Sequence, residues 1–181
     1  MAQKIEIISN AMISIGAAPI SSLTEGTEGL VGNALYENTY RGLLASHSWR
    51  FATKKAQLAR LTEKPINEYD YKYQLPSDLV TVVKVDGYTD YEIYGDNIYS
   101  NQPELYIDYR YRVDETILPD YYVLTLQFLL AAQFAIPITD NSQRAQVYQG
   151  LYEDQLRKAK AIDSMSRPQD AIVDSPLTGI H

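Results

Sequence analysis

The chain has 181 residues, no cysteine, and a net charge of −7 from 16 basic and 23 acidic side chains. The absence of cysteine excludes disulfides and thiolate zinc sites, and the acidic balance disfavours tight binding to DNA or RNA, which needs a basic patch. No signal-peptide pattern opens the sequence, and no apolar run approaches the roughly 20 residues that span a bilayer. These features predict a single globular domain that contacts no membrane.

Apolar residues at helical spacing predict two helices within residues 1–48. The first helix carries an apolar stripe formed by Ile5, Ile8, Met12 and Ile15. Gly16 and Pro19 end it, because glycine favours a helix C-cap and proline cannot continue the helix. Thr27 is a candidate N-cap for the second helix. Gly32 and Gly42 in that helix are either sites of close packing or simply tolerated, and the sequence leaves both explanations open.

Residues from about 49 to 115 switch to the alternating pattern of strands. Trp49 and Phe51 are expected in the core, because such rings bury a large apolar area. The segment Tyr69–Val85 predicts a strand, a Leu-Pro corner and a second, buried strand, with the Asp78 side chain bonded to backbone donors in the turn. Further strands are expected at residues 54–61, in a hairpin at 91–99, and at 105–113, where Arg110 and Arg112 share the polar face.

Two more helices are predicted after Pro119, a residue that suits the first turn of a helix. The helix of residues 121–136 is apolar nearly all round, as is typical of the central helix of a bundle, and Pro137 is expected to end it. Asp140 and Gln143 resemble a capping box that opens the last helix. The apolar stripe of that helix is formed by Tyr148, Leu151, Tyr152, Leu156, Ala159 and Ile162.

Together these patterns predict an α+β fold, an antiparallel bundle of about four helices with an inserted small antiparallel β-sheet and an extended C-terminal tail. The helices occupy residues 1–48 and 119–163, the β insert about 49–115, and the tail 164–181. Residues 69–115 hold ten acids against four bases, and ten of the 16 tyrosines fall in this region. Tyrosine is enriched both in strands and at interfaces, and both explanations are compatible with the pattern.

Patterns of catalytic or ligand-binding chemistry are missing from the sequence. There is no Gly-x-Ser-x-Gly turn, no glycine-rich phosphate loop and no cluster with metal-ligand spacing. The glycines of residues 26–32 lead into a helix without a preceding strand, and we interpret them as a loop. Asp86, Asp90 and Asp96 match no calcium-binding loop and are interpreted as a solvated acidic face. We predict that the protein is not an enzyme and has no catalytic residue, metal or cofactor.

Two aromatic motifs stand between the predicted N-terminal and C-terminal helices. They are His47-x-Trp49-x-Phe51-Ala52 and Tyr71-x-Tyr73-x-Leu75-Pro76-x-Asp78. In this order the segments resemble the head-to-tail adaptor proteins of tailed bacteriophages, the tail tubular protein A-like family, from about Lys4 to Ala171. The segments 49–52 and 75–78 are the most specific parts, and Ser48 departs from the family by standing where many members have proline.

The resemblance implies a structural virion protein at the head-tail junction, made in the host cytoplasm. Such adaptors form a ring of twelve copies that connects the portal protein ring to the tail tube or nozzle. DNA passes through the lumen during packaging and ejection without specific binding, and an acidic wall would repel phosphates over roughly 8 Å at physiological salt. The alternative prediction is a tyrosine-rich module of a virion or soluble protein that binds glycans or peptides.

The resemblance also suggests two sets of interface residues. The candidates for the portal interface are Arg157, Lys160, Arg167, Ile172, Val173 and Leu177. The candidates for the tail-side or subunit interface are Tyr88, Tyr91, Tyr94, Tyr99 and Tyr106.

Overall fold

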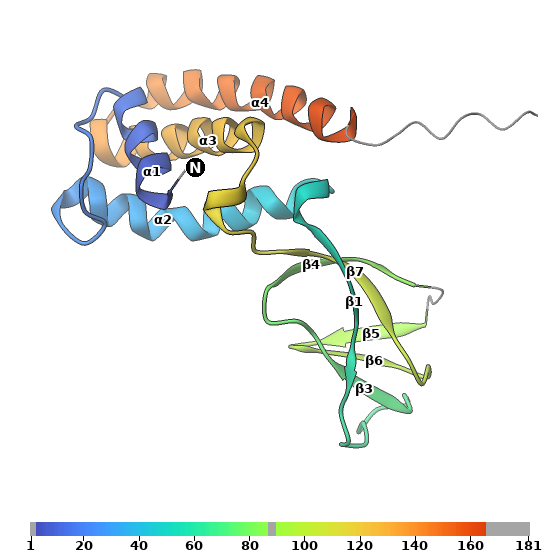
Figure 1. Cartoon of the computed structure of the whole chain (residues 1–181). Coiled ribbons are helices and arrows are strands. Elements are labelled where there is room, and N and C mark those ends of the chain that lie inside the picture. The colour runs from blue at the N-terminus through green and yellow to red at the C-terminus, as the bar shows by residue number, and fades with distance from the viewer. Residues whose placement is uncertain (1–2, 87–89, 166–181) are drawn as a thin grey trace, which may run out of the picture.

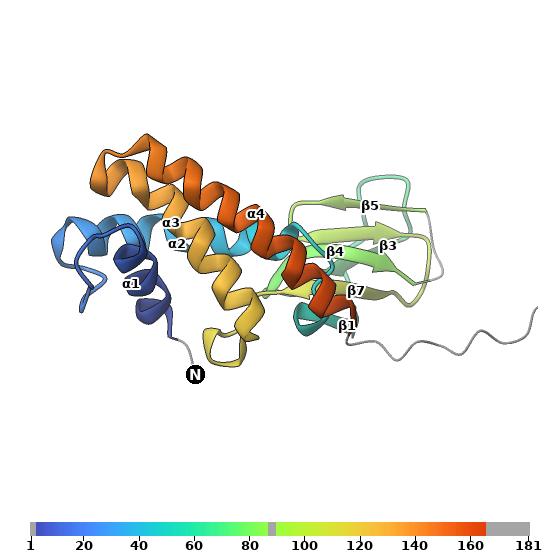
Figure 2. The same ribbon diagram turned by 90° about the horizontal axis from the view of Figure 1, so that it is seen from above.

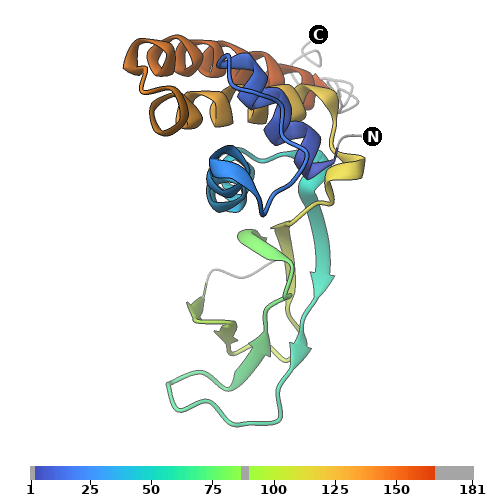
Figure 3. The same ribbon diagram turned by 90° about the vertical axis from the view of Figure 1, so that its left-hand side faces the viewer.

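The computed structural model describes residues 3–86 and 90–165, which form a helical bundle and a β insert (Figure 1). In this part of the chain the bundle consists of four α-helices, α1 (Lys4–Ser14), α2 (Gly26–Ala45), α3 (Asp120–Thr139) and α4 (Ser142–Met165). The insert projects away from the bundle, on the side where α2 lies (Figures 1 and 3). The predicted α+β fold is confirmed. The first two residues of the predicted tail, Ser164 and Met165, belong to α4, and the rest of the tail lies outside the described residues.

The insert is framed by two short 3-10 helices, η1 (Arg50–Ala52) and η2 (Glu115–Ile117). Its described strands are β1 (Thr53–Gln57), β2 (Ala59–Arg60), β3 (Tyr71–Gln74), β4 (Leu79–Val85), β5 (Tyr91–Tyr94), β6 (Asn97–Ser100) and β7 (Tyr106–Tyr111). They form two antiparallel sheets, ordered β1-β7-β4 and β2-β3-β6-β5. We expected one sheet. There are two because the corner at Leu75 and Pro76 separates β3 from β4, so that the two strands join different sheets.

The bundle and the insert have separate apolar cores. α3 is the central helix of the bundle and packs against α1, α2 and α4, as its sequence predicted. By length and composition alone α3 could also cross a membrane, which corrects the expectation that no segment reaches that limit. Buried helices of soluble proteins share this property, and the contacts of α3 with three helices account for its apolar character.

The start of α2 differs from the prediction. The helix begins at Gly26 after the extended residue Glu25, so Thr27 lies within the first turn and does not cap it. Gly26 has φ 72°, a left-handed value that glycine adopts without strain.

The boundary between α3 and α4 also differs from the prediction. Pro137 lies inside α3, which continues to Thr139. Asp140 ends α3 in the left-handed conformation, with φ 48°, and therefore does not open α4. The side chain of Asn141 caps α4 instead, accepting the backbone N–H of Arg144 at 2.8 Å.

The buried face of α4 is narrower than predicted. Tyr148, Tyr152 and Leu156 pack against the bundle core as expected. Leu151 and Ile162, however, are 41% and 47% exposed. In this part of the chain α4 has its main packing contacts with α3 alone. A helix packed on a single neighbour buries only a narrow stripe, and residues on its flanks stay in solvent.

The Leu-Pro corner is anchored differently from the prediction. β4 is an edge strand and is only half buried. The Asp78 carboxylate does not bond backbone donors in its turn. It accepts the Tyr109 hydroxyl and the Lys54 ammonium, each at 3.1 Å. Burial and the bond to Asp78 raise the pKa of Tyr109 to about 12. The corner is therefore tied to both β1 and β7.

The two glycines in α2 have different surroundings, which gives a testable prediction. A Cβ on Gly32 would lie 2.5 Å from Cγ2 of Ile8 in α1, whereas a Cβ on Gly42 would meet nothing within 4 Å. We expect Gly32→Ala to lower the free energy of unfolding by about 1–3 kcal/mol through overpacking. Gly42→Ala should raise it by up to about 1 kcal/mol, because alanine favours the helix. Urea denaturation measures both, and a stabilised Gly32→Ala variant would contradict the close packing of α1 on α2.

Candidate interaction surfaces

The described residues contain no group of three or more acidic or histidine side chains that could hold a metal. The hollows on the surface are open grooves between elements. One lies between α2, α3 and α4 and is lined by Leu35, Thr39, Gly42, Leu129 and Tyr152, among others.

Three of the predicted interface tyrosines, Tyr91, Tyr94 and Tyr99, lie on the four-stranded sheet. Tyr94 and Tyr99 face each other from β5 and β6 with ring centroids 5.8 Å apart. Together with Ile66, which is fully exposed, they line a groove at the end of the insert. Tyr91 is half buried against the insert core, so it contributes to packing as well.

Two other members of that set lie elsewhere or are not described. Tyr106 is on β7, in the other sheet, and its hydroxyl donates to the Glu104 carboxylate at 3.2 Å. The structure therefore brings Tyr94 and Tyr99 together but not the set as a whole. Tyr88 lies outside the described residues.

The predicted portal-interface residues that the structure describes are both on α4. Arg157 is exposed and pairs with Asp154 on the same helix. Lys160 is half buried near His47, and its charge contributes to lowering the pKa of that imidazole, after the larger effect of burial. The other members of the set, Arg167, Ile172, Val173 and Leu177, lie outside the described residues.

α3 and α4 carry exposed apolar side chains that the sequence either did not single out or, for Leu151 and Ile162, placed on a buried stripe. We call this surface the α3–α4 strip. It consists of Ile136, Val147, Leu151, Ile162 and Met165, whose exposed fractions range from 41% to 81%. Of these residues, Ile136 lines the groove between the two helices, together with Ala145 and Gly150, among others. Exposed apolar patches on a helix are typical of protein-protein contacts.

Three arginines connect the bundle to the insert. Arg41 of α2 donates to the Leu79 carbonyl of β4 at 3.0 Å. Arg110 of β7 is buried and donates to the Ala45 carbonyl at 2.8 Å and to the Ser48 hydroxyl at 2.7 Å. The carbonyl at the C-terminus of α2 is a favourable partner for a cation, because that end of the helix dipole is negative.

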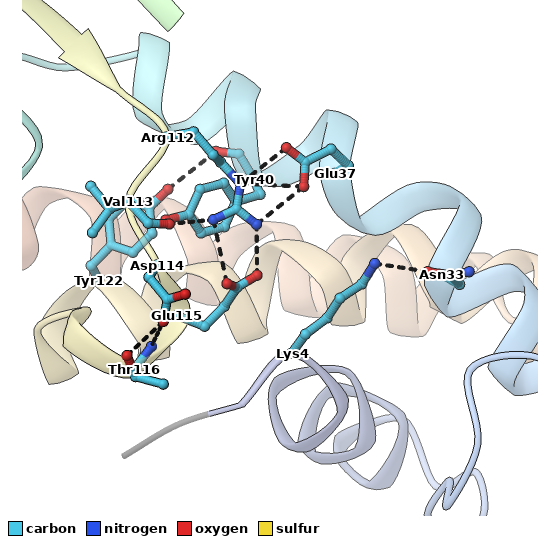
Figure 4. Close-up of polar contacts among 10 residues, drawn as sticks. All are labelled: Lys4, Asn33, Glu37, Tyr40, Arg112, Val113, Asp114, Glu115, Thr116 and Tyr122. Carbon is cyan, nitrogen blue, oxygen red and sulfur yellow. Dashed lines mark hydrogen bonds and ion pairs between the residues drawn. The ribbon is translucent and has the colours of Figure 1, made fainter. Parts of the chain in front are cut away.

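Arg112 makes the most extensive of these connections (Figure 4). Its guanidinium pairs with Glu37 of α2 at 3.0 Å and with Glu115 of η2 at 2.6 Å. It also lies 3.8 Å from the centre of the Tyr40 ring, whose hydroxyl donates to the Val113 carbonyl at 2.8 Å. Burial alone would lower the pKa of Arg112, but the bonds to Glu115 and Glu37 raise it above its usual value. The group stays charged and holds α2 to the end of β7.

A buried carboxylate connects α4 to η1, where the chain passes from the bundle into the insert. Asp163 is 1% exposed and accepts the backbone N–H of Arg50 at 3.1 Å and the Tyr121 hydroxyl at 2.8 Å. Burial, followed by the bond to Asp163, raises the pKa of Tyr121 above its usual value. The C-terminal end of α4 is thereby held beside the first residues of the insert.

Comparison of the chain with models of known protein families gives no match, and comparison with curated proteins gives none either. The assignment to the adaptor family therefore stays a prediction from the motifs described above.

Proposed function

We propose that the protein is the head-to-tail adaptor of a tailed bacteriophage, a structural subunit of the ring that joins the portal to the tail tube or nozzle. The observation that carries the proposal is the α3–α4 strip on a bundle with a projecting insert. A monomer gains nothing from exposing these side chains, whereas a ring would bury them between copies. The proposed family rests on the resemblance of the aromatic motifs at residues 47–52 and 71–78.

The charge and position of the insert support the same proposal. Its acidic residues suit a channel wall that does not retain DNA, because phosphates are repelled from carboxylates. The three arginine connections keep the insert at one angle to the bundle, which a subunit that joins two layers of a virion needs. We assign the insert to the tail side and to contacts with neighbouring subunits, and the end of α4 with residues 166–181 to the portal side.

The proposal is tested by assembly. The purified chain is mixed with portal rings from the same source, and negative-stain microscopy is expected to show a second ring stacked on the portal. Val147→Glu, in the α3–α4 strip, should abolish this ring while the chain stays folded. Gln143→Glu, one turn earlier on the same exposed helix, serves as the matched control and should assemble normally. If both variants assemble, the α3–α4 strip is not part of the interface. If the unmodified chain gives no stacked particle, the adaptor function is contradicted.

A second prediction concerns the portal arm. A chain that ends at Met165 should keep its unfolding midpoint, because both cores lie within the described residues. It should lose binding to portal rings by at least about tenfold. Co-sedimentation of the shortened chain with portal rings measures this. Unchanged binding would contradict the assignment of residues 166–181 to the portal side.

The groove at Tyr94 and Tyr99 is the observation that favours the alternative function. Aromatic rings beside acidic side chains also suit a glycan or a peptide. A module of this kind would give no stacked particle with portal rings. It would bind a component of a glycan array, and Tyr94→Ala would remove that binding.

A further inference from the structure

β1 is an open edge of the three-stranded sheet. It pairs with β7 through five consecutive residues, from Thr53 opposite Arg110 to Gln57 opposite Tyr106. Backbone groups of an edge strand that point away from its neighbour stay available for another strand. All of its residues except the half-buried Ala56 are exposed. The described part of the chain therefore presents a regular, uncovered strand edge.

The other edge strands among the described residues are less suitable. β4 shifts register twice along β7, and α2 packs against it, with Arg41 bonded to its first carbonyl. β2 is two residues long, and β5 is four residues long at the far side of the insert. Register shifts and short length both discourage the addition of a strand. β1 is thus the longest edge with unbroken register.

The C-terminal residues start beside this edge. Asp163 bonds the backbone N–H of Arg50, the first residue of η1, and η1 leads directly into β1. Figures 1 and 2 show the end of α4 next to the start of the insert. The chain continues for 16 residues after Met165. Four of them span at most about 14 Å when extended, so residue 170 can reach the first part of β1.

The sequence of that continuation suits the edge of β1. Asp170-Ala171-Ile172-Val173-Asp174 lies between Pro168 and Pro176, and its β-branched residues favour an extended conformation. Side chains of a strand alternate between faces. Ala171 and Val173 therefore share one face, and in the register that suits them they lie on the side of Ala56, which packs against the insert core.

The opposite face of the same segment offers charge complementarity. Asp170, Ile172 and Asp174 would lie on the side of Lys55. The Lys55 side chain is 57% exposed and already pairs with Asp86, but an ammonium has three donors and can serve a second carboxylate. Lysines on an edge discourage purely apolar strands, so an acidic segment is the partner that this edge favours.

We propose that residues 170–174 bind the edge of β1 in the free chain and extend the three-stranded sheet by a strand parallel to β1. The occupant is the chain's own C-terminal segment. The consequence that docking on the portal must first release this strand rests on the proposed function.

Hydrogen exchange measured by mass spectrometry tests the proposal. In the full chain the amides of β1 that point away from β7, which alternate along residues 54–57, should exchange at least about tenfold more slowly than in a chain that ends at Met165. Ile172→Pro should remove this protection, because proline lacks the N–H and disrupts a strand. Thr178→Pro, in the same tail but outside the segment, is the matched control and should keep it. Exchange in β6, in the other sheet, should be equal in all four chains.

Two results would overturn the proposal. Equal exchange of residues 53–57 in the full and shortened chains would show that the edge is not covered by the tail. Protection that disappears on dilution would show that a neighbouring copy supplies the strand. Portal binding, measured on the same chains, separates the two proposals. Binding without protection contradicts only the strand addition, and protection without binding contradicts only the adaptor function.

Discussion

Replacing Trp49 by alanine is expected to lower the free energy of unfolding by about 3–5 kcal/mol, the usual cost of truncating a buried large aromatic residue. Trp49 has no exposed surface. Its ring centre lies 4.9 Å from that of His47, 6.0 Å from that of Phe51 and 5.3 Å from that of Tyr122. Its indole N–H donates to the Leu43 carbonyl at 2.9 Å. The substitution would remove contacts to α2, α3 and η1 together.

The control for Trp49→Ala is Tyr94→Ala. Tyr94 is also aromatic and contacts one ring, that of Tyr99, but it is 56% exposed. Its truncation should cost less than about 1 kcal/mol, because little apolar area leaves a buried environment. Urea titration of both variants, followed by far-UV circular dichroism, measures the difference. A similarly small loss of unfolding free energy for both variants would contradict the conclusion that Trp49 packs α2, α3 and η1 together.

Replacing Arg112 by methionine is expected to lower the free energy of unfolding by about 2–3 kcal/mol. Removal of one partner from a buried ion pair leaves a charge uncompensated, at a cost of about 3–5 kcal/mol. The Glu115 side chain is only 15% exposed and would carry most of that cost, whereas Glu37 is 46% exposed and would be solvated. Because Glu37 would be solvated, we expect a loss of unfolding free energy below the about 3–5 kcal/mol of a fully buried pair.

Arg157→Met is the matched control for Arg112→Met. Arg157 also pairs with an acid three residues away, Asp154, but its side chain is 78% exposed. Exposed pairs contribute at most about 1 kcal/mol, so this substitution should change the urea midpoint little. Arg112→Met should in addition increase hydrogen exchange at the ends of β7 and α2. If the two substitutions cost the same, the Arg112 cluster does not join the bundle to the insert.

The α+β architecture followed from local patterns in the sequence. The period of the apolar residues separates the helices near the termini from the strands of the insert, because it depends only on which face of each element is buried. Trp49, the strands on either side of the Leu-Pro corner and the hairpin at residues 91–99 were predicted for the same reason. Gly16 follows the end of α1, as the sequence predicts. Its φ of 79° is a left-handed value that glycine adopts without strain.

The connections between elements could not be predicted in this way. Arg110 lies in β7 and Arg112 follows the end of this strand. Nothing local indicates that their side chains meet α2 and η2. Asp163 is a charged residue beside the predicted apolar stripe of α4, and nothing local indicates that it accepts a backbone N–H 113 residues away. Thr27, Asp140 and Pro137 were misplaced because the ends of helices depend on the turns that neighbouring helices impose.

The sequence by itself determined the class of each segment and the acidic, tyrosine-rich character of the insert, because these depend on composition and spacing alone. Only the tertiary structure decided which surfaces stay uncovered. Leu151 and Ile162 belong to the predicted apolar stripe of α4, but α4 packs mainly on α3, so both remain partly exposed and belong to the α3–α4 strip. The free edge of β1 likewise results from strand order, which is a property of long-range pairing and is not written in any short segment.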